Sequence, residues 1–137
     1  MRCLFVWLAP LSCLVTGCYT YTEVPGALGK VVDAHTGSPV PHARISRPLG
    51  SHEVPDTIRA STDGRSVVSV TSGKSGRFDL PPALHTQIAF MYLRNPKTMS
   101  GAFVITADGY ATKEVQGVAS SRHFWRADLG DVELSRP

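Results

Sequence analysis

The feature that most constrains the fold is a succession of short segments in which apolar and polar residues alternate, each closed by glycine or proline. Successive side chains of a strand point to opposite faces, so this alternation predicts half-buried strands. No segment carries apolar residues at helical spacing over three turns. The chain is therefore expected to be all-β, a seven-stranded antiparallel β-sandwich. The strand candidates are residues 27–34, 43–46, 57–61 (an edge strand), 66–72, 77–80, 87–94, 103–106, 111–115 and 132–134.

Glycine and proline mark where these strands end, and the chain holds 12 Gly and 10 Pro in 137 residues. Residues 73–76 (G-K-S-G) predict a hairpin turn that pairs the segments before and after it. Asp108-Gly109 predicts a second turn, because glycine tolerates a positive φ. Residues 47–65 are irregular, and most of this stretch is expected to form a long loop.

The first eighteen residues predict export and lipid attachment. An apolar run from Leu4 to Val15 has the length of a signal-peptide core and is shorter than the roughly 18 residues that span a bilayer as a helix. It ends in L-V-T-G-C, which resembles a bacterial lipobox, an aliphatic residue and two small residues before a cysteine. Residues 1–17 are thus expected to be a lipoprotein signal peptide, and Cys18 to be lipidated.

Lipidation of Cys18 would leave residues 18–26 as a short tether and residues 27–137 as the folded domain. Cys3 and Cys13 would leave with the signal, so no disulfide is expected. Two or more acyl chains anchor a protein stably without a transmembrane helix. The expected location is the cell envelope, in a Gram-negative host the periplasmic face of the outer membrane, because Tyr19 rather than aspartate follows the cysteine.

One stretch resembles a known family. Residues 29–45 (G-K-V-V-D-A-H-T-G-S-P-V-P-H-A-R-I) are similar to the opening signature of the carboxypeptidase regulatory-like domain family, G-x-V-x-D-x-x-T-G-x-P-L-x-G-A-x-V. A stretch similar to the family's T-x-x-x-G-x-F-x-L hairpin follows at residues 71–80, with one more residue between Thr71 and Gly76, and the A-x-G-Y turn lies at residues 107–110. The resemblance covers about residues 29–134. It departs from the pattern at His42, where the family usually has glycine, and in the insertion at residues 47–65.

The resemblance implies a prealbumin-like sandwich of seven strands. In metallocarboxypeptidases this domain accompanies the catalytic domain without supplying catalytic residues, so peptidase activity is not implied. The motif residues also have a structural interpretation of their own. Val31, Ile45, Phe78 and Leu80 are expected to face inward, and Tyr110 to place its hydroxyl on a nearby backbone group, like a tyrosine corner.

Catalytic, metal and nucleotide motifs are not evident. The five histidines (His35, His42, His52, His85 and His123) fall in expected turns or loops, without metal-ligand spacing. A cluster of His42 and His52 with Glu53 or Asp56 is a less favoured zinc alternative. With 14 Lys+Arg against 11 Asp+Glu spread along the chain, no nucleic-acid partner is expected. The chain is therefore expected to be no enzyme, with no catalytic residues, no metal and no cofactor.

A binding role is the better class. Phe124 and Trp125, flanked by Arg122 and Arg126, would form an aromatic and basic interaction surface if they are exposed. In the alternative, Trp125 covers one end of the core. The leading hypothesis is a lipid-anchored, non-enzymatic envelope protein whose sandwich contacts another protein or a surface polymer. The alternative is a carrier of small hydrophobic ligands or cargo, which predicts an apolar cavity of about 300 Å³ or more.

Overall fold

The computed structural model describes residues 18–50, 58–60, 66–88 and 98–137. This part of the chain is all-β, as the alternation predicted, with a single 3-10 turn, η2 (Ser121–His123). The strands are β1 (Cys18–Val24), β2 (Gly26–Asp33), β3 (Arg44–Pro48), β4 (Ile58–Ala60), β5 (Ser66–Thr71), β6 (Arg77–Leu80), β7 (Ala83–Ile88), β8 (Thr98–Thr106), β9 (Lys113–Ser120) and β10 (Arg126–Leu134).

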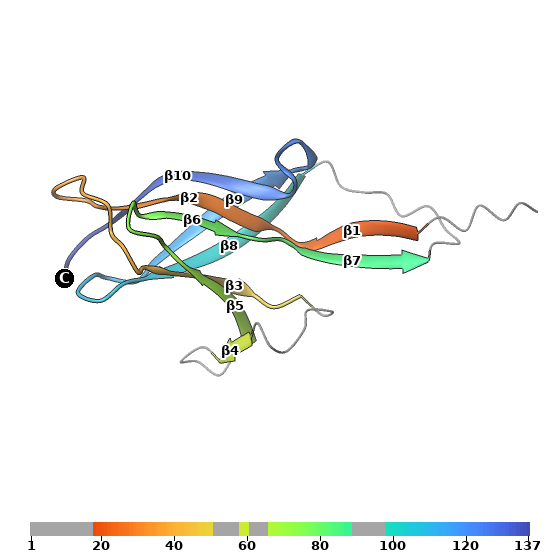
Figure 1. Ribbon diagram of the computed structural model, residues 1–137, viewed down its shortest axis with the longest axis horizontal. Helices are drawn as coiled ribbons and strands as arrows, with labels where there is room; N and C mark the ends of the chain where they lie inside the picture. The colour runs from red at the N-terminus through yellow and green to blue at the C-terminus, as the bar shows by residue number, and fades with distance from the viewer. Residues whose placement is uncertain (1–17, 51–57, 61–65, 89–97) are drawn as a thin grey trace, which may run out of the picture.

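Eight of these strands form one sheet in the order β4-β5-β3-β8-β9-β10-β2-β6, which rolls nearly closed (Figure 1). β4 is an edge strand, as expected for residues 57–61. All neighbours are antiparallel except β10 and β2, which run parallel. The sheet is therefore mixed, and the purely antiparallel, seven-stranded arrangement is not what the described strands show. The two parallel strands lie at opposite ends of the folded chain, so no tight turn dictates their relative direction.

The predicted hairpin at residues 73–76 is wrong in its pairing, although the turn is present. β5 pairs with β3 and β4, whereas β6 pairs with β2. Ser72 holds the end of β5 to β3: its Oγ donates to the Val40 carbonyl at 2.9 Å and accepts the Ala43 N–H at 2.9 Å. The Gly76 carbonyl in turn accepts the Val31 N–H of β2. The turn is a corner between two parts of the rolled sheet.

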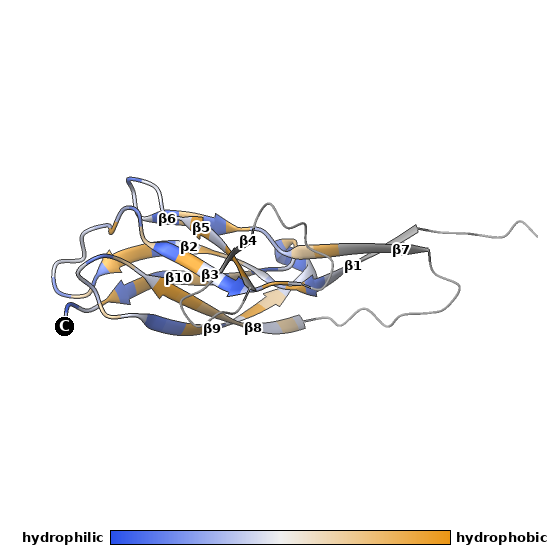
Figure 2. Ribbon diagram, turned by 90° about the horizontal axis from the view of Figure 1, so that it is seen from below, coloured by the Kyte–Doolittle hydropathy of each residue, from blue (hydrophilic) through white to orange (hydrophobic). Residues whose placement is uncertain are grey.

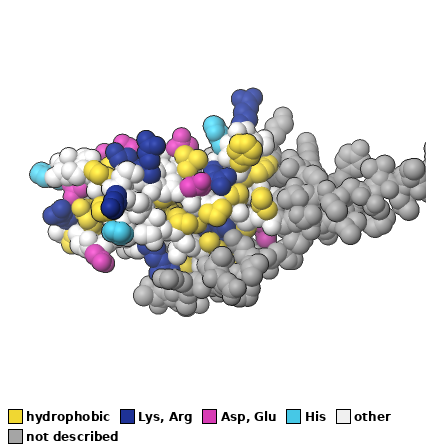
Figure 3. Space-filling view, in the orientation of Figure 1, with side chains coloured by type: hydrophobic (Ala, Val, Ile, Leu, Met, Phe, Trp, Pro, Cys, Tyr) yellow, Lys and Arg dark blue, Asp and Glu magenta, His cyan; other side chains and the backbone are white. Residues whose placement is uncertain are grey.

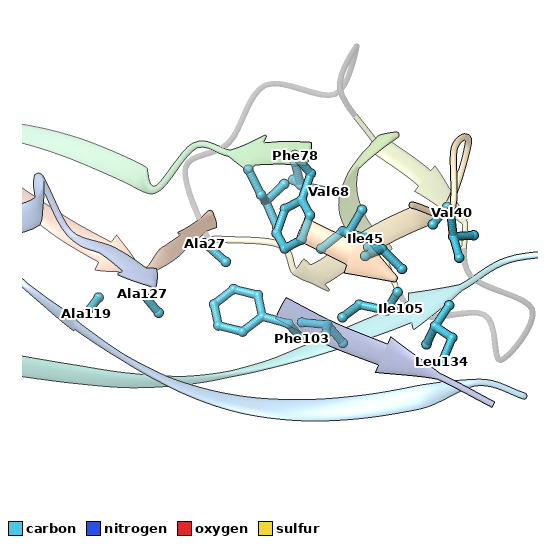
Figure 4. Close-up of a cluster of buried hydrophobic side chains, with 14 residues drawn as sticks. Ala27, Val40, Ile45, Val68, Phe78, Phe103, Ile105, Ala119, Ala127 and Leu134 are labelled. Carbon is cyan, nitrogen blue, oxygen red and sulfur yellow. The ribbon is translucent and has the colours of Figure 1, made fainter. Parts of the chain in front are cut away.

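The core lies inside this roll. Apolar residues alternate with polar ones along the strands (Figure 2), and the apolar set points inward. Phe103 and Ile105 of β8 lie in one cluster with Ile45 and Phe78 (Figure 4). The four positions expected to face inward are all buried. At one end the core residues are small, namely Ala27, Ala119 and Ala127, so the strands approach closely there.

β1 and β7 form a separate two-stranded antiparallel ribbon, which projects from the end of the sheet opposite the C-terminus (Figure 1). Its register runs from Val24 opposite Ala83 to Cys18 opposite Ile88. The stretch expected to be a simple tether is thus mostly strand. The expected strand at 87–94 contributes only its first two residues to β7, and its remainder lies outside the described residues. Seven residues at about 3.3 Å each make the ribbon roughly 20 Å long.

The ribbon root, which we define as Pro25, Gly26 and residues 81–83, is fixed to the sheet by close contacts. Pro25 is buried, and a β-carbon on Gly101 of β8 would lie 2.7 Å from its Cγ. Arg47 of β3, only 1% exposed, donates from Nη2 to the Pro81 carbonyl at 3.1 Å. Arg47 and Pro48 were expected in the long loop, yet they belong to β3. The ribbon therefore leaves the sheet from a tightly packed root.

Gly26 provides a test of this packing. A β-carbon there would lie 2.3 Å from the Leu80 carbonyl oxygen and 2.6 Å from the Pro82 nitrogen, both backbone atoms. We expect Gly26→Ala to lower the free energy of unfolding by about 1–3 kcal/mol, as overpacking typically does. Urea unfolding would measure it. Gly73→Ala is the control, because its β-carbon would meet nothing closer than 3.8 Å; equal losses in both variants would contradict a packed root.

Candidate functional site

At the end of the molecule away from the ribbon, three side chains form a clasp, which we define as Asp33, Tyr110 and Arg136. Asp33 ends β2 and is 4% exposed. Its Oδ1 accepts the N–H groups of His35 and Thr36 at 2.9 and 3.0 Å. Its Oδ2 accepts the Tyr110 hydroxyl at 2.9 Å and lies 3.2 Å from Nη2 of Arg136. The clasp joins the turn that follows β2 at residues 34–36, the Asp108-Gly109 turn and the C-terminal tail.

The clasp keeps the Asp33 carboxylate ionised. Hydrogen bonds from the Thr36 N–H, the Tyr110 hydroxyl and the His35 N–H hold the pKa of Asp33 well below its usual range. The Tyr110 hydroxyl and the Asp33 charge raise the pKa of Arg136, whose guanidinium lies 5.4 Å from the Tyr110 ring centroid. The tyrosine corner expected at Tyr110 is therefore present in a different form, with a side-chain carboxylate in place of a backbone acceptor.

Surface hollows lie beside the clasp. One of about 440 Å³ is lined by Asp33, Ala34, His35, Thr36, Ser135 and Arg136. A neighbouring one of about 400 Å³ shares Ala34 and Ser135. Both are open to solvent, whereas the inward side chains of the sheet pack into one buried cluster. The described hollows are thus surface features lined mainly by polar residues, whereas the carrier hypothesis predicts a cavity lined by apolar residues.

At the ribbon end, the root loop, which we define as Ser121–Trp125, carries part of the predicted interaction surface. Phe124 is 79% exposed and Arg122 is exposed beside it. Trp125 is half-buried, and its carbonyl accepts the Gly26 N–H at 2.9 Å. Arg126 lies in β10 and pairs through Nε with Asp79 Oδ1 at 2.6 Å. The structure therefore presents Arg122 and Phe124 to solvent and ties Trp125 and Arg126 into the sheet.

The backbone of the root loop is strained. Phe124 and Trp125 have φ of 50° and 58°, the left-handed region that favours glycine. A non-glycine residue in this conformation costs roughly 1–2 kcal/mol. The strained turn holds a large apolar side chain in solvent instead of burying it. Backbone strain of this kind clusters at functional sites, so the root loop is a candidate site.

The remaining predicted site residues are scattered. Cys18 begins β1 at the free end of the ribbon, opposite Ile88. His35, His42 and His123 lie exposed in turns, but His85 lies in β7 and not in a loop, because the ribbon extends beyond Pro82. The partners weighed for a zinc cluster, His52, Glu53 and Asp56, lie outside the described residues. The described part of the chain holds no group of three potential metal ligands, and none of its helices is long and apolar enough to cross a membrane.

Two arginines of β3 escaped the sequence interpretation. Among the described residues Arg47 is the largest fully buried side chain, and only its place in an apparently irregular stretch hid it. Arg44 stands on the opposite face of β3, with Nε and Nη2 buried and without a hydrogen-bond partner among the described residues. Asp33 was visible as the aspartate of the G-x-V-x-D motif. Its pairing with Tyr110 and Arg136, at separations of 77 and 103 residues, left no local signal.

Comparison with known proteins gives distant structural neighbours only. No protein-family model matches the chain, and no curated protein matches it. It is similar to 3-chlorocatechol 1,2-dioxygenase from Rhodococcus opacus 1CP, with 11% identity, a TM-score of 0.45, and coverage of 85% of this chain and 62% of that one. For mercury-inhibited catechol 1,2-dioxygenase from Acinetobacter sp. ADP1 the values are 13%, 0.45, 84% and 53%. The chain thus spans little more than half the length of these enzymes.

These neighbours correct one expectation. Both are enzymes, so the conclusion that the chain is not an enzyme is overturned and we withdraw it. Likenesses at this identity and TM-score carry no activity, substrate or metal over to this chain.

The clasp predicts a pH dependence of stability. Because the pKa of Asp33 is lowered on folding, its contribution is present above the unfolded value of about 3.9 and is lost as the pH falls through the folded value. We expect Asp33→Asn to reduce the free energy of unfolding at pH 7, with the gap to wild type narrowing below about pH 4. Urea unfolding across pH would measure this. Asp131→Asn, which removes an exposed carboxylate, is the control. A difference in free energy of unfolding between wild type and Asp33→Asn that widens as the pH falls would contradict the clasp.

Proposed function

We propose that the chain is a lipid-anchored member of the carboxypeptidase regulatory-like domain family, with a prealbumin-like sandwich. Two separate motifs of the family pattern support the assignment because they meet in space. Asp33, from the opening signature, accepts the hydroxyl of Tyr110, from the A-x-G-Y turn. Gly37 of the signature has a φ of 67°, and Gly109 of the turn a φ of 80°. A positive φ of this size favours glycine, because other residues adopt it only with strain.

His42 supports the same assignment through a departure. It stands where the family pattern has glycine, and its φ is 59°, again the left-handed region. The left-handed backbone that the pattern's glycine implies is therefore retained, although the residue is histidine. The His42 N–H still donates to the Ser72 carbonyl at 3.1 Å, so the turn is held in place against its strain.

Restoring glycine tests this interpretation. We expect His42→Gly to raise the free energy of unfolding by about 0.5–1 kcal/mol, since relief of a left-handed strain of roughly 1–2 kcal/mol exceeds the extra chain entropy of glycine. His42→Ala removes the same exposed imidazole but keeps the strain, and should give no such gain. Thermal and urea unfolding of the two variants would measure the difference. If both variants changed the free energy of unfolding equally, His42 would no longer support the family assignment.

The anchor in this proposal is Cys18, and the observation that carries it is the position of Cys18 in the ribbon. It lies at the free end of a two-stranded arm whose root is packed into the sheet, at the opposite end of the molecule from the C-terminus (Figure 1). Acyl chains on Cys18 would hold the domain on a membrane without a transmembrane helix. The arm would set the distance between the sandwich and the lipid.

The function we propose is contact with another protein or a surface polymer of the cell envelope. With the anchor at the ribbon end, the end that carries the clasp points away from the membrane. It presents the exposed turn residues His35 and Thr36 and an open hollow of about 440 Å³ beside them. The carrier alternative has less support, because the inward side chains fill the rolled sheet.

Intact-mass analysis and membrane fractionation of wild type and Cys18→Ala test the anchor. We expect wild type to begin at Cys18, to carry acyl chains and to sediment with membranes. Cys18→Ala should carry no acyl mass and should retain residues 1–17. An unmodified wild-type chain in the soluble fraction would overturn the anchor.

The partner surface is tested with a photoreactive amino acid placed at Thr36, in the clasp end, or at Gln116, exposed on the side of β9. Crosslinking in intact cells should give one discrete adduct from Thr36 that is absent from Gln116. Adducts of equal yield from both positions would contradict a contact at the clasp end.

A further inference from the structure

We propose that Arg44, with the threonine on either side of it, forms a binding site for a carboxylate that an acidic segment of a partner protein supplies. This inference rests on the proposed function, because it names the chemistry of the partner that contacts the end of the molecule away from the ribbon.

The first argument is the state of the Arg44 guanidinium. Its Nε and Nη2 are buried and have no hydrogen-bond partner among the described residues. These two nitrogens share one edge of the guanidinium, and their parallel N–H groups match the two oxygens of a carboxylate. Buried polar groups in native proteins are nearly always hydrogen-bonded. A pair of buried donors without an acceptor in the described chain therefore points to an acceptor from outside it.

Arg47, also in β3 but on its other face, provides the contrast. Its Nη1 donates to the Pro48 carbonyl at 2.8 Å and its Nη2 to the Pro81 carbonyl at 3.1 Å. The fold thus supplies acceptors to the inward arginine, whereas none of the described residues supplies one to Arg44. A structural role explains Arg47 and leaves Arg44 unexplained.

The second argument is the pair of hydroxyl groups beside Arg44. The register places Thr71 of β5 directly opposite it on one side and Thr106 of β8 on the other. Side chains directly opposite in an antiparallel pair lie on the same face of the sheet. The three residues therefore form a row across the outer face, which we call the Arg44 row. Thr71 is exposed and Thr106 is half-buried, and their hydroxyls can donate to an anion that Arg44 holds.

The third argument is charge. Arg44 forms no ion pair within the described part of the chain. The register places Glu114 in β9, beyond Val104 of β8, and its Oε1 accepts from Gln116 Nε2 at 3.3 Å. Basic and acidic side chains are interspersed over the face that Figure 3 shows. One cation balances the single charge of a carboxylate, whereas a phosphate monoester carries about 1.5–2 charges at pH 7.

The fourth argument is the place of the Arg44 row in the molecule. β3 begins at Arg44 on the side that carries the C-terminus (Figure 1). Thr106 ends β8, and the turn after it leads to Tyr110 of the clasp. Arg44 is half-buried, so part of its side chain reaches the surface. Because its Nε and Nη2 have no described acceptor, the guanidinium breaks no described hydrogen bond when it turns to meet a carboxylate.

NMR of the full chain in detergent tests the site through the Arg44 Nε–H signal. The probes are a hexapeptide of alternating serine and glutamate, its glutamine counterpart, and acetate at matched ionic strength. We expect the glutamate peptide to shift the signal and the glutamine peptide to leave it unchanged. Acetate offers no further group to the threonine hydroxyls and should need a concentration about tenfold higher. The Arg47 Nε–H signal is the internal control and should not move.

The affinity of variants is measured by fluorescence anisotropy of the labelled glutamate peptide. Arg44→Gln should raise its Kd at least about tenfold, because a charge-assisted pair of hydrogen bonds is lost. Thr106→Val keeps the shape of the side chain and removes the hydroxyl, and should raise the Kd about fivefold. Arg77→Gln is the matched control, because it removes the same charge from an exposed position in β6. It should change the Kd less than about twofold.

Urea unfolding separates binding from folding. Arg44→Met should leave the urea midpoint at or above that of wild type, because an apolar side chain replaces a buried charged group that has no partner. Arg47→Met should lower the midpoint, because the Pro48 and Pro81 carbonyls lose their donor. An equal fall in both variants would overturn the proposal, since Arg44 would then serve the fold.

Equal changes of Kd in Arg44→Gln and Arg77→Gln, or no shift with the glutamate peptide, would also overturn the proposal. Acetate acting at the same concentration as the peptide would overturn the peptide ligand in favour of a small free carboxylate. The Thr36 crosslink reports the partner contact separately. An adduct whose yield is unchanged by Arg44→Gln would keep the contact and overturn the site, whereas peptide binding without an adduct would keep the site and overturn the contact.

Discussion

The parallel pairing of β2 with β10 is the constraint on which the rest of the structure depends. β2 has β10 on one side and β6 on the other, so the first and last parts of the domain lie side by side in the rolled sheet. Its first residue, Gly26, has no room for a side chain, because the backbone of residues 80–82 lies against it. Its last residue, Asp33, receives the clasp. One strand thus positions both ends of the molecule.

This arrangement separates two kinds of surface. At the start of β2, the bond from Gly26 to the Trp125 carbonyl sets the root loop beside the ribbon. At its end, the Asp33 carboxylate gathers a turn, a tyrosine and the C-terminal tail. The two surfaces lie at opposite ends of one strand of eight residues, so an anchor at the ribbon leaves the clasp end facing away from it.

Local patterns predicted the strands but not their partners. Alternation located β2, β5 and β6, because the side-chain period of a strand is a local property. The partner of β6 was mistaken, because Ser72 and Gly76 direct the two strands to different neighbours through bonds to residues about thirty and forty-five positions away. Arg47 was missed for the same reason, because its Nη2 donates to the backbone carbonyl of Pro81, 34 residues away. The aromatic and basic residue types at 122–126 pointed to Phe124 and Arg122, which are exposed, whereas no local pattern pointed to Arg136 of the clasp.

His42 and Phe124 both have a left-handed backbone, but their strain has different explanations. His42 and Phe124 have nearly the same φ, and both are exposed. At His42 the family pattern has glycine, so its strain follows from a turn that the fold requires and the side chain adds nothing the fold needs. At Phe124 glycine would also relieve the backbone, yet it would remove the one large ring that the root loop holds in solvent. The strain at Phe124 therefore corresponds to no glycine of the family pattern, and the exposed ring is what distinguishes this position from His42.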